Sequence, residues 1–237
     1  LDHLTKGRIA WNVVTSYLAD ANENFGLGDQ MMDHDERYDR AEEYMDVVYQ
    51  LWEHSWEEDA AVRDKARDIH NDPLKVHEIN YEGKYFKVPG PHMCEPSPQR
   101  SPVIFQAGGS PRGIDFAGRH AEAVFGIFPS IEGCENYVRK IRDATEKFGR
   151  NRTDLKVFPG ITVVVAATDA EAKQKFEDCK KYQSPEGALA LFSGWAGVDL
   201  SSLISMDNLV EADSQAVKSV LSAFVQIDPD REWSLKE

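Results

Sequence analysis

The clearest periodic pattern of apolar positions lies in residues 33–56, DHDERYDRAEEYMDVVYQLWEHSW. Apolar side chains recur there every three or four residues, which predicts an amphipathic helix with one buried stripe. The stripe consists of Tyr38, Ala41, Tyr44 or Met45, Val48 and Leu51-Trp52. Asp33 or Asp35 is a plausible N-cap. The acids that follow, Glu36, Asp39, Glu42 and Glu43, are expected to face solvent in the early turns, where they suit the helix dipole.

Short apolar runs predict a second kind of element, namely buried strands. They occupy residues 7–16, 103–105, 121–128 and 157–166. Helical patterns alternate with these runs. One follows Ser110, one covers residues 131–148, and one follows Thr168, which is a candidate cap. This alternation is typical of βαβ units and a parallel sheet, so we predict an α/β fold.

The first of these runs, GRIAWNVVTS, is apolar on both faces, as in a strand that is covered on both sides. Asn12 is the polar exception. Thr15 and Ser16 fall where the strand should end, at the functional rim of an α/β barrel.

The remaining segments show weaker patterns. Charged residues 57–71 predict a short exposed helix closed by Pro73, and residues 79–88 predict a β-hairpin around Glu82-Gly83. Prolines make residues 89–100 a loop. A helix is also predicted to begin near Asp20, within a polar connection over residues 17–33. Beyond Tyr182 we expect one modest helical stretch, a weak helix over residues 215–225 and a polar tail.

Composition narrows the class of protein. The 237 residues carry 41 acidic and 27 basic side chains, for a net charge of −14, which argues against binding to nucleic acid or to an anionic membrane surface. The three cysteines are widely spaced, with no zinc-type spacing, so no metal site is expected. A reducing cytoplasm is the simplest location. No run reaches the length of a membrane span, and no signal-peptide pattern opens the sequence.

A candidate anion site follows the strand at residues 103–105. Gly108-Gly109-Ser110-Pro111 provides a sharp turn, a helix cap at Ser110 and a proline suited to the first helical position. Free N–H groups and the positive end of a helix dipole would point at a ligand in this turn. From these residues alone, a phosphate cradle and an ordinary strand-to-helix turn are equally good interpretations.

His34 and Tyr38 are a second candidate pair. They are spaced one helical turn apart, so an imidazole and a phenol hydroxyl would share one face near a helix N-terminus, which suits a phosphate. The simpler alternative is that Tyr38 starts the apolar stripe and His34 is solvated. His120 is expected to be a structural histidine.

Motifs for other chemistries are missing from the sequence. It contains no nucleophile elbow, Walker motif, Rossmann fingerprint, HExxH or conspicuous carboxylate pair, and no catalytic residue can be assigned. Two possible phosphate-holding elements without such motifs indicate an enzyme whose cofactor carries the reaction.

One family contains this set of motifs in this order. The segments GRIAWNVVTS, NFG, HDERYDRAEEY, LW, GKYFKVPGP, PSPQRSPVIFQAGGS and GRHAEAVF strongly resemble the flavin-dependent monooxygenases of the nitrilotriacetate monooxygenase component A and dibenzothiophene-sulfone monooxygenase type, within the bacterial-luciferase-like superfamily. The resemblance covers residues 1–197.

The resemblance implies a (β/α)₈ barrel and a two-component enzyme. A separate NAD(P)H flavin reductase supplies reduced FMN, and O₂ then oxidises a small organic substrate. His34, Tyr38 and Ser110 fall on family positions that bind the FMN phosphate, with the Gly109 backbone beside Ser110. Asn12 falls on the flavin-ring side. Full-length members are expected to form homo-oligomers.

The match is also expected to be partial. We expect residues 1–197 to form an incomplete barrel without its first strands and its last strand, with an insertion over about residues 57–100. Residues 198–237 are expected to form a helical or irregular segment. Two other hypotheses remain open at this stage. One is an inactive truncated remnant that binds a partner or a phosphate ligand. The other is a different phosphate-binding barrel enzyme.

Overall fold

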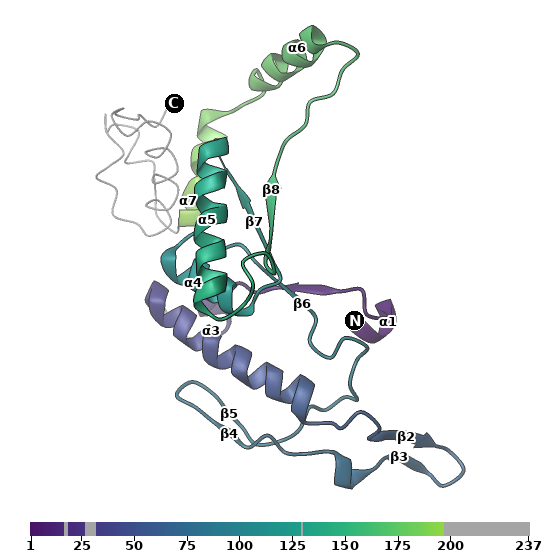
Figure 1. Cartoon of the computed structure of the whole chain (residues 1–237). Helices are drawn as coiled ribbons and strands as arrows, with labels where there is room; N and C mark the ends of the chain where they lie inside the picture. The colour runs from purple at the N-terminus through teal and green to yellow at the C-terminus, as the bar shows by residue number, and fades with distance from the viewer. Residues whose placement is uncertain (17–18, 27–31, 129, 197–237) are drawn as a thin grey trace. The chain divides into compact units, whose positions relative to one another are not determined.

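The computed structural model describes residues 1–16, 19–26, 32–128 and 130–196 (Figure 1). The chain divides into two compact units. The first contains Leu1–Thr15, Met32–Val124 and Ile141–Lys156, and the second contains Ser16–Met31, Phe125–Lys140 and Val157–Glu237.

Most of the regular structure belongs to the first unit. Its helices are α1 (Asp2–Thr5), α3 (His34–Tyr49), the π-helical turn η1 (Gln50–His54), the 3₁₀ turn η2 (Pro73–Lys75) and α4 (Pro111–His120). Its strands are β1 (Ala10–Asn12), β2 (Ala61–Asp64), β3 (Ile69–Asn71), β4 (Tyr81–Glu82), β5 (Lys87–Val88) and β6 (Val103–Gln106). The unit boundary falls within β7 (Ala123–Ile127) and α5 (Ile131–Lys147) and just after the first residue of β8 (Lys156–Gly160).

The main sheet has the strand order β1-β6-β7-β8. β1 pairs with β6 in parallel, with Ala10 opposite Val103, and β6 pairs with β7 in parallel, with Phe105 opposite Ala123. The predicted alternation of strands and helices is therefore confirmed from β6 to α6 (Asp169–Lys180). Parallel strands place their carboxyl ends at one edge, so β1 and β6 end side by side.

The core of the first unit lies where α3 and α4 meet and where β6 and β7 face them. Met45 of α3, Phe116 of α4 and Ile104 of β6 are at most 2% exposed. The ring of Phe116 contacts Tyr38, with centroids 5.7 Å apart. The predicted apolar stripe of α3 is thus confirmed at Tyr38, Met45 and Val48, which are all buried.

Two predicted strands are shorter in the structure. β1 covers only Ala10–Asn12 of the predicted residues 7–16, and Val14 beyond it is 64% exposed. The expectation that this strand is covered on both faces is therefore wrong for the described residues. β8 ends at Gly160, and three of the apolar residues that follow it, Ile161, Val163 and Val165, are exposed.

The predicted helix over residues 57–71 is wrong, because this segment forms the antiparallel hairpin β2–β3. The carboxylate of Asp64 accepts hydrogen bonds from the backbone N–H groups of Ala66 and Arg67, at 2.9 and 3.1 Å, and so stabilises the turn. Asp68 takes a left-handed backbone conformation, with φ of 57°. Local hydrogen bonding by an acidic side chain thus competes successfully with helix formation.

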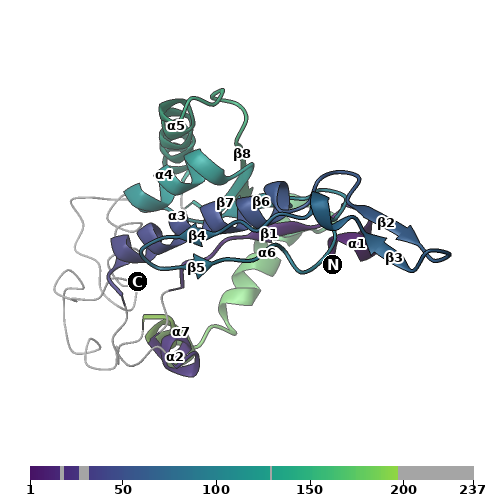
Figure 2. The same cartoon turned by 90° about the horizontal axis from the view of Figure 1, so that it is seen from below.

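The predicted hairpin in residues 79–88 is confirmed as β4–β5, which lies beside α3 in both views (Figures 1 and 2). The Glu43 carboxylate of α3 accepts hydrogen bonds from the backbone N–H groups of Lys84, Tyr85 and Phe86, at 2.7–3.1 Å. Glu43 was expected to face solvent, and that expectation is wrong because the hairpin turn offers three backbone donors to one carboxylate.

The second unit contains α2 (Ala19–Asn24), α6 and α7 (Pro185–Ala196). Thr168 caps α6 as predicted, because its hydroxyl accepts a hydrogen bond from the Glu171 N–H at 3.2 Å. α2 and α7 match the predicted helices near Asp20 and beyond Tyr182. The helix predicted over residues 215–225 and the predicted C-terminal segment lie outside the described residues.

Gly118 permits the close packing of α4 against α5, which gives a test of this core. A Cβ on Gly118 would lie 2.8 Å from the backbone carbon of Ala144. Replacing Gly118 with alanine should therefore lower the free energy of unfolding by about 1–3 kcal/mol through overpacking, although alanine favours a helix by roughly 1 kcal/mol over glycine. The measurement is urea unfolding followed by circular dichroism.

Gly194 of α7 provides the matched control, because a Cβ there would meet no atom within 4 Å. Gly194→Ala should stabilise the protein or leave it unchanged. A Gly118→Ala variant as stable as the parent protein would contradict the proposed close packing.

Candidate functional site

The candidate site begins at the turn between β6 and α4. Ser110 is the N-cap of α4, and its hydroxyl accepts a hydrogen bond from the Gly113 N–H at 3.1 Å. Pro111 occupies the first turn of the helix. A Cβ on Gly109 would meet no atom within 4 Å, so the turn is open at this residue. The predicted strand, turn and capped helix are therefore confirmed.

The second part of the site is the N-terminus of α3. Asp33 is its N-cap residue but makes no side-chain cap hydrogen bond. The first N–H groups of a helix have no partner within the helix, so they present donors and a positive dipole end to this region. His34 is the first helical residue, and its ring centroid lies 5.2 Å from that of Tyr38. The prediction that these two side chains share a face is confirmed.

Tyr38 joins the two parts. Its hydroxyl would lie 2.9 Å from a Cβ on Gly108 and 2.7 Å from a Cβ on Gly113. No other residue type fits at either position without displacing the phenol. We call the group formed by His34, Tyr38, Gly108, Gly109, Ser110 and Gly113 the turn cradle. It brings a phenol, an imidazole and the N-terminal turn of α4 together.

Gln106 is a member of this region that the sequence interpretation missed. It is 4% exposed, and its side-chain amide donates a hydrogen bond to the Tyr38 hydroxyl at 3.2 Å. Its amide oxygen accepts a hydrogen bond from the Gly108 N–H at 2.6 Å. Because both the donor and the acceptor of this buried amide are hydrogen-bonded, Gln106 holds the Tyr38 hydroxyl and the Gly108 turn in place. The available signal was a polar residue at the end of an apolar strand, two positions before a pair of glycines.

Asn12 is the remaining predicted site residue. It is the last residue of β1, opposite Phe105 of β6, and its side chain is exposed. It therefore lies at the same sheet edge as the turn after β6. Among the described residues, no hydrogen bond links Asn12 to the turn cradle.

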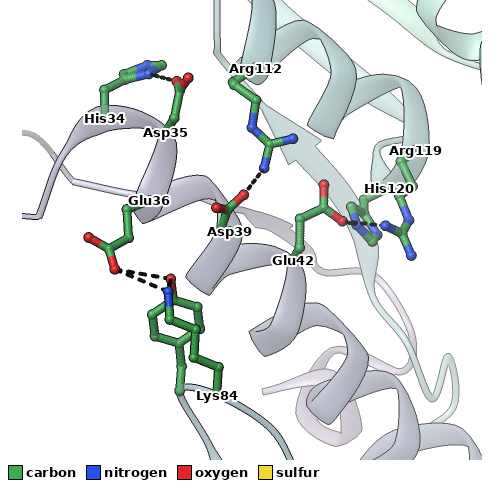
Figure 3. Close-up of polar contacts among 10 residues, drawn as sticks. His34, Asp35, Glu36, Asp39, Glu42, Lys84, Arg112, Arg119 and His120 are labelled. Carbon is green, nitrogen blue, oxygen red and sulfur yellow. Dashed lines mark hydrogen bonds and ion pairs between the residues drawn. The ribbon is translucent and has the colours of Figure 1, made fainter.

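Ion pairs connect α3 to α4 along their shared length (Figure 3). Arg112 donates to Asp39 at 2.5 Å, and one turn further along α3 the Glu42 carboxylate lies 2.8 Å from both Arg119 and the Nε2 atom of His120. His120, the last residue of α4, is 6% exposed and confirms the expected structural role. Glu42 was expected to face solvent, and this is wrong because α4 covers it.

The protonation of this buried network is shifted. Burial alone raises the pKa of Glu42, but the hydrogen bond and charge of His120, with Arg119 and Arg112, outweigh burial and hold this pKa below its usual value. Tyr49, whose hydroxyl lies 3.3 Å from Nδ1 of His120, has a pKa raised to about 12 by burial and by the charge of Glu122. Both groups therefore keep their usual charge states at neutral pH.

A cavity of about 260 Å³ lies elsewhere in the first unit. Its lining includes Ile9 and Pro102, which directly precede β1 and β6, together with Trp52, Trp56 and Arg100. It therefore lies at the opposite edge of the sheet from the turn cradle, and no cradle residue lines it.

These features define a parallel α/β protein with an open glycine turn and a capped helix at the carboxyl edge of its sheet. The luciferase-like monooxygenase family matches residues 1–221, so the chain belongs to this family. The family resemblance stated from the motifs is thereby confirmed. Dibenzothiophene-sulfone monooxygenase of Rhodococcus erythropolis and nitrilotriacetate monooxygenase component A of Aminobacter aminovorans match at 41% and 42% identity.

Two further relatives are more similar. Long-chain alkane monooxygenase of Geobacillus thermodenitrificans is 55% identical over 87% of this chain and 47% of its own length. Dimethyl-sulfide monooxygenase of Hyphomicrobium sulfonivorans is 46% identical over 100% of this chain and 49% of its own length. The chain thus spans about half the length of the curated relatives it matches.

Solved structures of similar proteins match the fold of this chain, again over about half of their own length. The crystal structure of long-chain alkane monooxygenase matches with a TM-score of 0.82 and 52% identity, over 93% of this chain and 50% of that one. A riboflavin lyase, solved with modified FMN and riboflavin, matches with a TM-score of 0.83 and 41% identity, over 92% of this chain and 49% of that one. Within the described ranges, no helix is long and apolar enough to cross a membrane.

The Glu42 network leads to a pH-dependent prediction. Because the pKa of Glu42 is lower in the folded than in the unfolded state, its stabilisation is present above the unfolded pKa and is lost as pH falls through the folded pKa. Glu42→Gln should cost about 2 kcal/mol at pH 7, the range for hydrogen bonds to a charged group. The difference from the parent protein should shrink below about pH 4.

Urea unfolding of both proteins at pH 7 and at pH 3 measures this difference. Glu58→Gln is the control, because Glu58 is exposed and precedes the β2–β3 hairpin. A cost for Glu42→Gln that stays constant between the two pH values would contradict the assignment.

Proposed function

We propose that the protein is an FMN-dependent monooxygenase, which uses reduced FMN and O₂ to oxidise a small organic substrate. A separate NAD(P)H flavin reductase supplies the reduced flavin. Family membership supports this proposal, together with a 41%-identical relative that was solved with modified FMN. The observation that carries it is the contact between the Tyr38 hydroxyl and the glycines of the capped α4 turn.

The turn cradle fits the phosphate group of FMN. Its donors are the Ser110 hydroxyl and neighbouring backbone N–H groups, the Tyr38 hydroxyl and the His34 imidazole. These groups suit an anion of several acceptor oxygens at a helix N-terminus. The open space at Gly109 lets a ligand approach the backbone, while Gly108 and Gly113 let the Tyr38 hydroxyl approach the turn. We assign His34, Tyr38, Gly109 and Ser110 to the phosphate.

Asn12 is proposed to face the flavin ring. It stands at the end of the neighbouring strand β1, at the edge where the turn cradle lies. A side-chain amide can both donate to and accept from a flavin's polar edge.

The chemistry of the cofactor determines what the chain itself must do. Bound reduced FMN would supply two electrons and two protons, so that one oxygen atom of O₂ enters the substrate and the other leaves as water. The residues of this chain bind and orient the phosphate end. We further propose that the sheet is part of a (β/α)₈ barrel, whose first strands and last strand lie outside this sequence.

Flavin binding provides the first test. Tyr38→Phe, Ser110→Ala and His34→Ala should each weaken FMN binding, by about two- to thirteenfold for a single hydrogen bond of about 0.5–1.5 kcal/mol. Titration of FMN fluorescence in the parent protein and its variants gives the dissociation constants.

Each variant has a matched control. Tyr44→Phe changes an exposed tyrosine of the same helix, Thr168→Ala removes the cap of a helix outside the site, and His54→Ala changes an exposed histidine. The controls should bind FMN like the parent protein. Equal effects in the controls, or no effect in the site variants, would refute the site assignment.

Oxygen consumption tests the reaction. With NADH, FMN and a flavin reductase, the protein should increase oxygen consumption and product formation when a suitable substrate is present. The candidates are a small alkane, sulfide, sulfone or aminopolycarboxylate, the substrate types named among its relatives. Reactions without the protein, and with catalase to remove free peroxide, are the controls. A protein that binds no flavin would instead favour a non-catalytic remnant.

A further inference from the structure

The turn cradle contains donors but no permanent positive charge. A phosphate monoester carries a charge between −1.5 and −2 at neutral pH. The first turn of α3 adds acids, Asp35 and Glu36, and Asp39 follows one turn later. A cation near the cradle would therefore have a large effect on whether a phosphate binds there.

Arg37 directly precedes Tyr38, but its Nη1 atom donates to the Met32 carbonyl oxygen at 2.6 Å. Arg112 is the arginine next to the cradle in α4. It is the second residue of α4 and lies between the cap at Ser110 and the glycine at position 113. Side chains of a helix lean toward its N-terminus, so a long side chain here extends toward the turn. The guanidinium is held by one hydrogen bond, from its Nη2 atom to Asp39, at 2.5 Å.

The residues of the ion pair are neighbours in sequence of the residues that form the cradle contact. Asp39 directly follows Tyr38 in α3, and Arg112 directly precedes Gly113 in α4, while the Tyr38 hydroxyl packs against Gly113. The Arg112 side chain is 30% exposed, and that of Asp39 is 60% exposed. Figure 3 shows Arg112 reaching from the start of α4 to Asp39 on α3.

We propose that Arg112 supplies the positive charge of the phosphate site and makes the protein select FMN over phosphate-free riboflavin. Asp39 holds the guanidinium at the edge of the cradle. A guanidinium has five N–H donors, and Asp39 engages one nitrogen, so further donors can bind phosphate oxygens. This inference rests on the proposed flavin site and adds its selectivity.

The competing explanation is an ordinary surface ion pair between two helices. Such exposed pairs contribute little to stability and would not distinguish one flavin from another. Selectivity between FMN and riboflavin therefore separates the two explanations, because these ligands differ only in the phosphate.

The experiment compares FMN with riboflavin in the parent protein and in Arg112→Gln, by fluorescence titration at low and at high salt. Arg112→Gln should weaken FMN binding about tenfold, as expected for loss of a charge-assisted hydrogen bond, and leave riboflavin binding unchanged. The effect should shrink at high salt, because exposed charges are screened.

Arg119→Gln is the matched control, because Arg119 pairs with Glu42 in the last turn of the same helix. It should leave the ratio of FMN to riboflavin affinity unchanged, whereas Arg112→Lys should restore part of it by restoring the charge. An unchanged ratio in Arg112→Gln would overturn the inference.

The outcomes also distinguish this inference from the function on which it rests. If Tyr38→Phe and Ser110→Ala weaken FMN binding but Arg112→Gln does not, the flavin site stands and the role of Arg112 fails. If none of the three variants changes FMN binding, or if the parent protein binds no FMN, the proposed site fails and the role of Arg112 fails with it.

Discussion

The close approach of α3 to the start of α4 is the constraint on which the rest of the first unit depends. The Tyr38 hydroxyl occupies space that a Cβ at Gly108 or Gly113 would fill, so two glycines are the condition for this contact. Gln106 then hydrogen-bonds both the Tyr38 hydroxyl and the Gly108 N–H of the turn. The ion pairs of Asp39 and Glu42 keep the two helices in the register that this contact requires. A local steric requirement and a line of charges along the helices thus determine the same geometry.

Much of this architecture follows from patterns that are local in the sequence. The periodicity of residues 34–49, and the strand, glycine turn and cap around Ser110, each involve neighbours within a few positions, so their structures were predictable. Partners that are distant in sequence were not. Glu42 and Glu43 looked like solvated acids because His120 and the β4–β5 turn lie 78 and about 42 positions away. The β2–β3 hairpin was missed because Asp64 bonds the turn, which charge density alone does not reveal.

The same distinction holds for the candidate site. The sequence indicated His34, Tyr38 and Ser110, and the fold brings the last two against one turn, with the His34 ring in tilted contact with Tyr38. The roles of these residues toward a flavin remain proposals. Gln106 escaped notice because its importance lies in bridging two elements rather than in any motif of its own. The net charge of −14 also says little about this edge of the sheet. Helix dipoles and a single arginine act over a few ångströms, while the overall charge is screened beyond about 10 Å at 0.1 M salt.

The edge-on contact between Trp11 of β1 and Trp52 of η1, with centroids 5.8 Å apart, has a consequence for spectroscopy. Trp11 directly precedes Asn12, and tryptophan emission overlaps the absorption band of an oxidised isoalloxazine. A chromophore bound beside Asn12 would therefore quench Trp11 by energy transfer, and the coupled indoles would report the strand's environment in the near-ultraviolet. The protein thus contains its own optical probe at the end of β1, without a label.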